Sequence, residues 1–358
     1  MKTKFLSAAF LLLGISMSNA QVVQSSTETG VGTENGAYQN ATTNGVFVGY
    51  QAGKVNTGVN NTMVGHQAGL ANTTFTNNSL FGAFAGSASN AYDNTYIGNE
   101  AGRYNQLGEG NVTVGSLTMS TSLSTTGSYN TVVGFSAGKV NRGGNNVFVG
   151  TSAGANNANG GGNVAIGFDA GRSNVSGSQN IFIGQQAGYA ETGSHKLYVA
   201  NTNTTAPPIY GDLNTKKIAI GGFTPLSTSD GFPTTVGGAS VTGYRLFVKG
   251  GILTDEVRVA TTWADYVFAD NYSLPTLTEV EMYIKENGHL PNVPSAKIVE
   301  SDGIEVGEMA KIHQEKIEEL TLYAIEQNKQ IEAQKLQLEQ QQKDIDELKA
   351  SVKALMNK

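Results

Sequence analysis

The chain has 358 residues, a net charge of −6, no cysteine and 45 glycines. Without cysteine it has no disulfides, thiolate metal sites or cysteine nucleophiles. The acidic balance and the lack of a basic stripe exclude a nucleic-acid partner.

The first 20 residues have the pattern of a secretory signal. Two lysines precede the apolar run 5–15, and small residues stand at Ser18 and Ala20, the −3 and −1 positions of a cleavage site. The apolar run is too short to cross about 30 Å of hydrocarbon. We therefore predict cleavage after Ala20, no transmembrane span, and export to the cell surface or the extracellular medium, with the periplasm as an alternative.

After an N-terminal segment, 21–43, residues 44–194 contain nine copies of the pattern Asn-x-apolar-apolar-Gly-x-x-Ala-Gly. The first glycines of successive copies are 16 to 19 residues apart, which is too short for helical repeats. They are Gly49, Gly65, Gly82, Gly98, Gly115, Gly134, Gly150, Gly167 and Gly184. The pattern predicts a mainly β fold, a β-roll solenoid with two short strands and two turns in each coil.

A β-branched or aromatic residue precedes each of these glycines, as short strands prefer. The residue two positions earlier shares its strand face, and the residue between them points the opposite way. Both faces are mostly apolar, so we expect both to be buried, one inside the coil and the other against another copy of the chain. We place Val149 in the coil interior.

Each Ala-Gly pair, such as Ala52-Gly53, provides a small side chain and a residue free to take positive φ at a tight corner. The fifth copy departs from this pattern. It has Ser116-Leu117-Thr118-Met119 instead, and the longest interval follows. We expect a loop or defect there in place of a regular corner.

The repeat resembles the head repeats of YadA-like trimeric bacterial adhesins, in which an Asn-Ser-Val-Ala-Ile-Gly unit recurs. Asn163-Val164-Ala165-Ile166-Gly167 is the most similar copy, and the resemblance covers about 145 residues. The resemblance implies a left-handed β-roll joined as a parallel homotrimer. The family's repeats are a little shorter and lack a regular Ala-Gly, so the coil shape departs from the family pattern.

Beyond the repeats, short strands separated by turn residues predict a β connector over 195–262. The strands are expected at 196–199, 207–212, 217–221, 244–248 and 257–259. Residues 263–308 have the composition of a small α/β module for trimerisation or chaperoning. Within it, Thr276 and Glu279 have capping-box spacing at the start of a helix, which Gly288 is expected to end.

This module is similar to the tail-fibre-like C-terminal module of many Bacteroidetes proteins, in its strings Asp265-Tyr266-Val267-Phe268 and His289-Leu290-Pro291-Asn292-Val293-Pro294-Ser295. It is also distantly similar to the intramolecular chaperones that end phage tail spikes. Those chaperones can cut their own chain with a serine-lysine dyad in a Ser-Asp-x-Arg-x-Lys string. Here Ser301-Asp302 is followed by neither the arginine nor the lysine, so we expect no self-cleavage.

Residues 309–358 predict a helix with a heptad seam. The first core position holds Ile317, Ala324, Ile331, Leu338, Ile345 and Val352, and the second holds Leu320, Gln327, Gln334, Gln341, Leu348 and Leu355. A solitary helix would expose this seam to water, so these residues predict a coiled-coil oligomer. The three glutamine layers cost stability while fixing register, and the heptad alone leaves dimer and trimer open.

We predict no catalytic, cofactor-binding or metal-binding residues. Segments 49–54 and 134–139 resemble phosphate loops, but three residues separate their glycines where four are needed. The four histidines are scattered without the pairing of a zinc site.

Together these features predict an exported, non-catalytic homotrimeric fibre with a structural or adhesin-like role. A fibre component of an extracellular phage-tail-like or gliding apparatus is the alternative, and a self-cleaving intramolecular chaperone is the third hypothesis. The exposed residues are mostly Asn, Thr, Ser and Gly, a surface that binds glycans, proteins or nothing with equal plausibility, so the sequence leaves a surface glycan or protein ligand open.

Overall fold

The structure is a computed structural model that describes residues 21–24, 29–32, 44–121, 127–228 and 230–357. The predicted signal, residues 1–20, lies outside the described residues. The chain divides into two compact units. Unit 1 comprises Met1–Pro233 and Gly243–Ile252, and unit 2 comprises Thr234–Thr242 and Leu253–Lys358.

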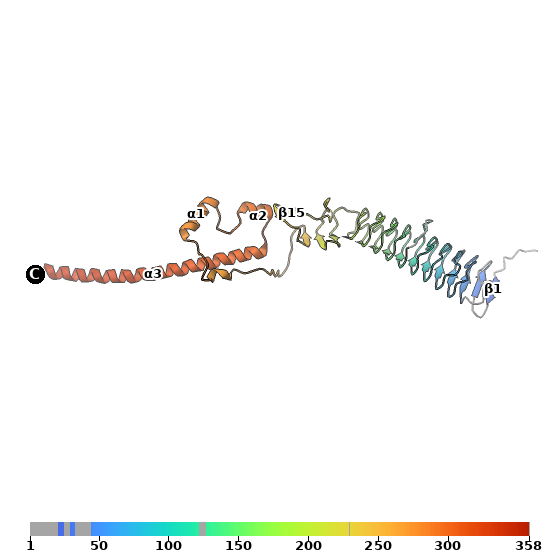
Figure 1. Ribbon diagram of the computed structural model, residues 1–358, viewed down its shortest axis with the longest axis horizontal. Helices are drawn as coiled ribbons and strands as arrows, with labels where there is room; N and C mark the ends of the chain where they lie inside the picture. Colours follow the sequence, from blue (N-terminus) through green and yellow to red (C-terminus); the bar gives the residue numbers. More distant parts are fainter. Residues whose placement is uncertain (1–20, 25–28, 33–43, 122–126, 229, 358) are drawn as a thin grey trace, which may run out of the picture. The chain divides into compact units, whose positions relative to one another are not determined.

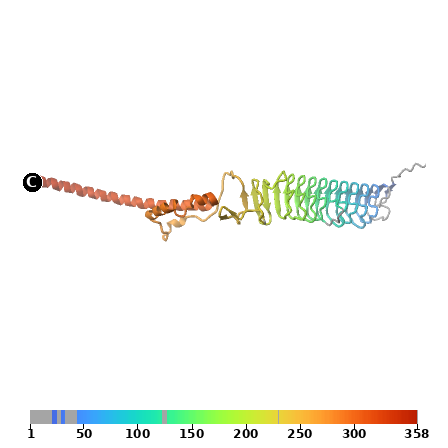
Figure 2. The ribbon, with the colours of Figure 1, turned by 90° about the horizontal axis from the view of Figure 1, so that it is seen from above.

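Unit 1 is a β-solenoid, whose coils stack side by side in Figures 1 and 2. A single 15-stranded sheet runs through it, in which nine parallel strands of three residues supply one strand to each coil. These strands are β3 (Val46–Val48), β4 (Thr62–Val64), β5 (Ser79–Phe81), β6 (Thr95–Ile97), β7 (Val112–Val114), β8 (Thr131–Val133), β9 (Val147–Val149), β10 (Val164–Ile166) and β11 (Ile181–Ile183). An antiparallel pair, β1 (Gln21–Gln24) and β2 (Thr29–Gly32), precedes them, and β2 is parallel to β3.

The described coils contain one strand each, so the predicted second strand is wrong. Turns around the Ala-Gly pairs take its place. The Ala52 amide donates to the Gly49 carbonyl within the turn at 3.3 Å, and the Gly53 amide donates to the Ala68 carbonyl of the next coil at 2.9 Å. Because the turns also bond coil to coil, the backbone groups are satisfied without a second strand.

The middle residue of each strand fills the coil interior. These residues are at most 1% exposed: Phe47, Met63, Leu80, Tyr96, Thr113, Val132, Phe148, Ala165 and Phe182. The alanines of the Ala-Gly pairs share the same buried clusters. The placement of Val149 in the interior is therefore wrong: Phe148 points inward, and the alternation of a strand puts Val149 on the partly exposed outer face.

The fifth coil keeps a regular corner, so the expected defect at 116–119 is wrong. The Gly102 amide donates to the Thr118 carbonyl at 2.8 Å, as in the other corners. Met119 takes the place of glycine at φ 44° and is fully buried. Its side chain fits because the same coil has the small Thr113 at its interior strand position. Part of the long interval, residues 122–126, lies outside the described residues.

The glycine after each strand is required by two features of its backbone. Gly134 has φ +130°, and a Cβ added there would lie 2.5 Å from the Gly150 carbonyl oxygen of the next coil. L-residues rarely adopt this φ, and the neighbouring carbonyl leaves no room for a methyl group. The same approach recurs along the row of first glycines.

A ladder of buried asparagines precedes the strands. In each step the backbone amide of one residue donates to the side-chain oxygen of the asparagine in the coil before it, at 2.8 to 3.0 Å. The ladder consists of Asn61, Asn78, Asn94, Asn111, Asn130, Asn146, Asn163 and Asn180, and it ends at the Lys196 amide.

The C-terminal end of the solenoid is closed by β12 (Lys196–Val199), β13 (Ile209–Asp212), β14 (Lys217–Ile220) and β17 (Leu246–Val248). Strand β12 is parallel to β11, whereas β13 reverses the direction. Two half-buried or buried ion pairs lie here, Lys196 with Asp212 and Lys217 with Asp230, each at 2.7 Å. Stacked and tilted rings of Tyr210, Phe223, Phe232 and Phe247 cover the last interior residues.

Unit 2 contains a small hairpin of β15 (Thr235–Val236) and β16 (Ala239–Ser240), a 3₁₀ helix η2 (Asp265–Phe268), and helices α1 (Leu277–Asn287), α2 (Ala296–Asp302) and α3 (Val306–Met356). The capping box at α1 is confirmed, since Thr276 and Glu279 each accept a hydrogen bond from the other's backbone amide. Gly288 ends α1 at φ 76°, as predicted.

Two other predictions for this part of the chain are wrong. Residues 257–259 are exposed and form no strand, and 263–308 is helical, without the strands of an α/β module. The nearest strands in unit 2 belong to the β15–β16 hairpin, where the Gly238 amide donates to Asp302 Oδ1 at 3.0 Å. The hairpin therefore packs at the end of α2.

Candidate functional site

The predicted seam of α3 lies open to solvent. All twelve predicted oligomerisation residues are exposed in the single chain. Among the apolar ones the exposed fraction runs from 43% at Ile331 to 72% at Leu355. A helix in a water-soluble protein normally turns its apolar stripe toward a core, so this stripe lacks its cover in one chain.

Near the start of α3 the opposite side is charged and buried, whereas from Ala324 to Met356 every residue of the helix is exposed. Glu315, Glu318 and Glu319 are 5%, 5% and 8% exposed. The Tyr266 hydroxyl of η2 donates to Glu315, and the Tyr272 hydroxyl donates to Glu319 at 2.5 Å. The segment 265–272 thus covers the charged side of the helix and leaves the apolar side free.

Two of these carboxylates share one cation. Lys316 Nζ lies 2.7 Å from Glu315 and 2.9 Å from Glu319. Burial opposes ionisation of Glu315, but hydrogen bonds from Lys316, Tyr266 and Asn292 outweigh it and lower the pKa of Glu315 to about 2. The hydrogen bond to Glu315, with burial added, raises the pKa of Tyr266 to about 12. The network is therefore an ionised one at neutral pH.

Glu318, the third buried glutamate of this side, has only one of its two carboxylate oxygens hydrogen-bonded. One of its carboxylate oxygens accepts from the Gln314 amide at 2.9 Å. The other, Oε2, is buried without a hydrogen-bond partner among the described residues. Burying an unsatisfied carboxylate oxygen costs stability, so unit 2 carries this cost as a single chain.

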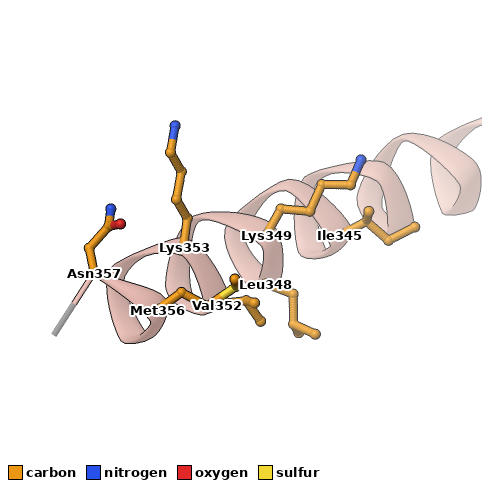
Figure 3. Close-up of a pocket in the computed structure, with 7 residues that line it drawn as sticks. All are labelled: Ile345, Leu348, Lys349, Val352, Lys353, Met356 and Asn357. Atoms are coloured by element: carbon orange, nitrogen blue, oxygen red, sulfur yellow. The ribbon is translucent and has the colours of Figure 1, made fainter.

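Figure 3 shows the seam at the C-terminal end of α3. Ile345, Leu348, Val352 and Met356 line a shallow concavity of about 410 Å³ together with Lys349, Lys353 and Asn357. Lys349 and Lys353 project to one side of the helix in this view, and Leu348 projects to the other. The end of the helix thus keeps an apolar strip beside a basic one.

A second uncovered apolar surface lies on unit 1. The outer faces of the solenoid strands present two rows of side chains, the first and third residues of each strand. Val46, Phe81, Ile97, Val112, Ile166 and Ile183 in these rows are each about two fifths exposed. The rows follow the sheet from coil to coil, because consecutive strands pair in register.

The histidines do not converge on one site. His66 stacks on Tyr50 and packs edge-on against Phe84, with ring centroids 5.3 and 5.0 Å away. His289 and His313 belong to unit 2, where the His289 ring packs edge-on against Tyr283. Within the described part of the chain, no group of three or more His, Asp or Glu side chains is placed to hold a metal ion.

Ser301, the residue considered for self-cleavage, has a local bonding role. Its hydroxyl donates to Asp302 at 2.6 Å and to the Ile298 carbonyl at 3.2 Å. Asp302 in turn accepts from the Gly238 amide of the hairpin. Ser301 therefore helps to hold the end of α2 against the β15–β16 turn.

Of the helices that the structure describes, none combines the length and apolarity needed to cross a bilayer. No family model, curated protein or solved structure matches this chain.

Sequence reasoning located the seam but missed what covers the other side of α3. Tyr266 and Glu315 are 49 residues apart in sequence, and no local pattern connects them. It also missed the role of the repeat asparagines, although they were visible in the motif. Their even spacing was the available signal, since a side chain that recurs once per coil must stack on itself.

Proposed function

We propose that this chain is an exported, non-catalytic fibre subunit that assembles as a parallel homotrimer with a structural or adhesin-like role. The observation that carries this proposal is the burial pattern at the start of α3, where Glu315, Glu318 and Glu319 are covered while the apolar seam is exposed along the whole helix. A helix with this pattern is stabilised when its seam packs against the same seam of other copies.

The outer face of the solenoid supports the same assembly. The row of third strand residues is Val, Ile or Phe in every coil, whereas the row of first residues also contains Thr62, Ser79, Thr95 and Thr131. The in-register strands make both rows straight. A second copy of the same face is the cover that this repetition favours, since contact residues then recur at the strand spacing of about 4.8 Å. The number three comes from the resemblance to trimeric adhesin heads.

The structural role rests on the form of the head. A solenoid of about nine turns repeats the same surface once per coil. Repeated weak contacts on linked sites add to a strong overall attachment, so such a head suits adhesion or scaffolding better than recognition by one deep pocket.

Sedimentation equilibrium of residues 21–358 tests the assembly. We expect the mass of a trimer for this protein, and monomers or aggregates for Ile331→Asp combined with Ile345→Asp, because each charge enters an apolar layer. A dimer would contradict the trimer, and a monomeric parent protein would contradict the assembly altogether.

The chain offers a matched control on the same helix. Leu336 and Lys343 lie five residues after Ile331 and Leu338, on the side of α3 away from the seam, and Leu336 is itself 68% exposed. Leu336→Asp combined with Lys343→Asp should leave the oligomer intact. Equal dissociation by both pairs would show that added charge, and not the seam, controls assembly.

A further inference from the structure

A cavity in unit 2 lies beside the first turns of the α3 seam. It has a volume of about 750 Å³. Its apolar walls come from Leu277 and Val280 of α1, Leu290 and Val293 of the loop after α1, and Ile317 and Leu320 of α3. The cavity therefore joins α1 to the beginning of the seam.

The charged groups and the tyrosines around this cavity are bonded within the chain, and its polar lining also includes Ser273 and His313. Lys316 pairs with Glu315 and Glu319, and Glu319 also accepts from Tyr272. The Tyr323 hydroxyl donates to the Pro275 carbonyl at 2.5 Å. Because the charged groups are paired within the chain and most of the wall is apolar, the occupant that fits is a mainly apolar one.

Unit 2 also lacks a core that would explain α1 on its own. The structure gives α1 and α2 no buried residue. Among the described residues of unit 2, only Ala264 and Val267 are buried hydrophobic side chains. Helix α1 therefore has an apolar stripe, Leu277 and Val280, that faces the cavity without filling it.

Two residues belong to the cavity and to the seam at the same time. Ile317 and Leu320 line the cavity and are also the first residues of the two core positions. Packed helices lie about 8–10 Å apart axis to axis, so a helix that contacts Ile317 and Leu320 takes up the space of the cavity.

We propose that this cavity is the docking site for the first turns of α3 from a second copy of the chain. Helix α1 of one subunit then closes over the α3 helix of its neighbour and contacts it through Leu277 and Val280. This inference rests on the proposed oligomer and adds to it a contact outside the heptad seam.

The absence of cysteine allows a direct test in the full chain. Two differently tagged chains are co-expressed, one with Val280→Cys and the other with Leu320→Cys, and are treated with a short bismaleimide crosslinker. Each chain has a single thiol, so any link is between subunits. We expect the mixed link to form at least tenfold more than with Met282→Cys, an exposed position of α1 that does not line the cavity.

Sedimentation of the same samples separates the two proposals. A monomeric sample overturns both the oligomer and the docking site. An oligomeric sample with no more mixed link than the Met282 control overturns the docking site alone.

Hydrogen exchange of the unmodified protein covers the case in which a cysteine variant does not fold. Docking predicts that the amides of α1 exchange at least tenfold more slowly in the oligomer than in the dissociated Ile331→Asp, Ile345→Asp variant. Equal exchange of α1 in both would overturn the docking site.

Discussion

The backbone amide of Asn146 donates to the side-chain oxygen of Asn130 at 2.9 Å, across the boundary between two coils of the solenoid. The Asn130 side chain also donates to Asn111 in the preceding coil at 2.9 Å. Asn130 is fully buried. One side chain therefore bonds three consecutive coils together.

Asn130→Ala should lower the stability of the solenoid clearly. It leaves the Asn146 amide buried without its acceptor, and an unsatisfied buried group costs about 1–3 kcal/mol. Chemical denaturation followed by circular dichroism measures the loss. Asn159→Ala, at an exposed position, is the control and should change stability little. Equal losses would contradict a structural role for the ladder.

Phe148→Asp and Val149→Asp should differ although they are neighbours. Phe148 is 1% exposed inside the coil, and an aspartate there would bury an unpaired charge at a cost of several kcal/mol. Val149 lies on the partly exposed outer face. We expect Phe148→Asp to unfold the solenoid, and Val149→Asp to leave it folded while weakening assembly. Thermal unfolding and sedimentation distinguish them; a folded Phe148→Asp protein would refute the assigned interior.

Deleting residues 146–162, one full repeat of 17 residues, should leave a folded solenoid. Each coil contacts mainly its neighbours, so a whole period can be removed without changing the register of the others. Small-angle scattering should show a shortening by about one strand spacing, 4.8 Å. A deletion of eight residues from the same repeat breaks the register and serves as the control, which should not fold.

Unit 2 should lose stability in acid. The pKa of Glu315 in the folded chain is about 2, lowered from the usual 4.5 of a glutamate side chain. The ionised carboxylate stabilises the folded chain fully at pH values above the pKa of Glu315 in the unfolded chain. This stabilisation is lost as the pH falls from 4.5 toward 2. Glu315→Gln should flatten this decline. Far-ultraviolet circular dichroism of α3 between pH 6 and 2 measures it, and an identical decline in both proteins would exclude Glu315 as its cause.

The solenoid class and the capping of α1 could be predicted because both depend on residues close in sequence. A repeat of fixed length determines the stacking, and Thr276 and Glu279 are only three residues apart. Which strand face points inward could not be predicted from alternation, because both faces are apolar. The inward face is identified by Phe148, which shares a buried cluster with Ala153 of its own coil.

The corner at Met119 shows a different limit. The missing Ala-Gly predicted a defect, since a glycine usually takes positive φ at a tight corner. Methionine in place of this glycine is tolerated because the interior of that coil has a small residue, Thr113, and so has room for Met119. The small Thr113 compensates for the large Met119 because the two side chains share one coil interior. A motif that is considered one position at a time does not reveal such a packing relationship.

The side-chain oxygens of the asparagine ladder all accept from the following coil. Asn146 shows this, since its oxygen accepts from the Asn163 amide, whereas its nitrogen donates both to the later Gly160 carbonyl and to the earlier Asn141 side chain. A finished coil therefore presents a buried acceptor to a residue that leaves the ribosome after it. Because domains generally fold from the N-terminal end during synthesis, each coil can act as a template for the next, and the order of translation matches the order in which the bonds close.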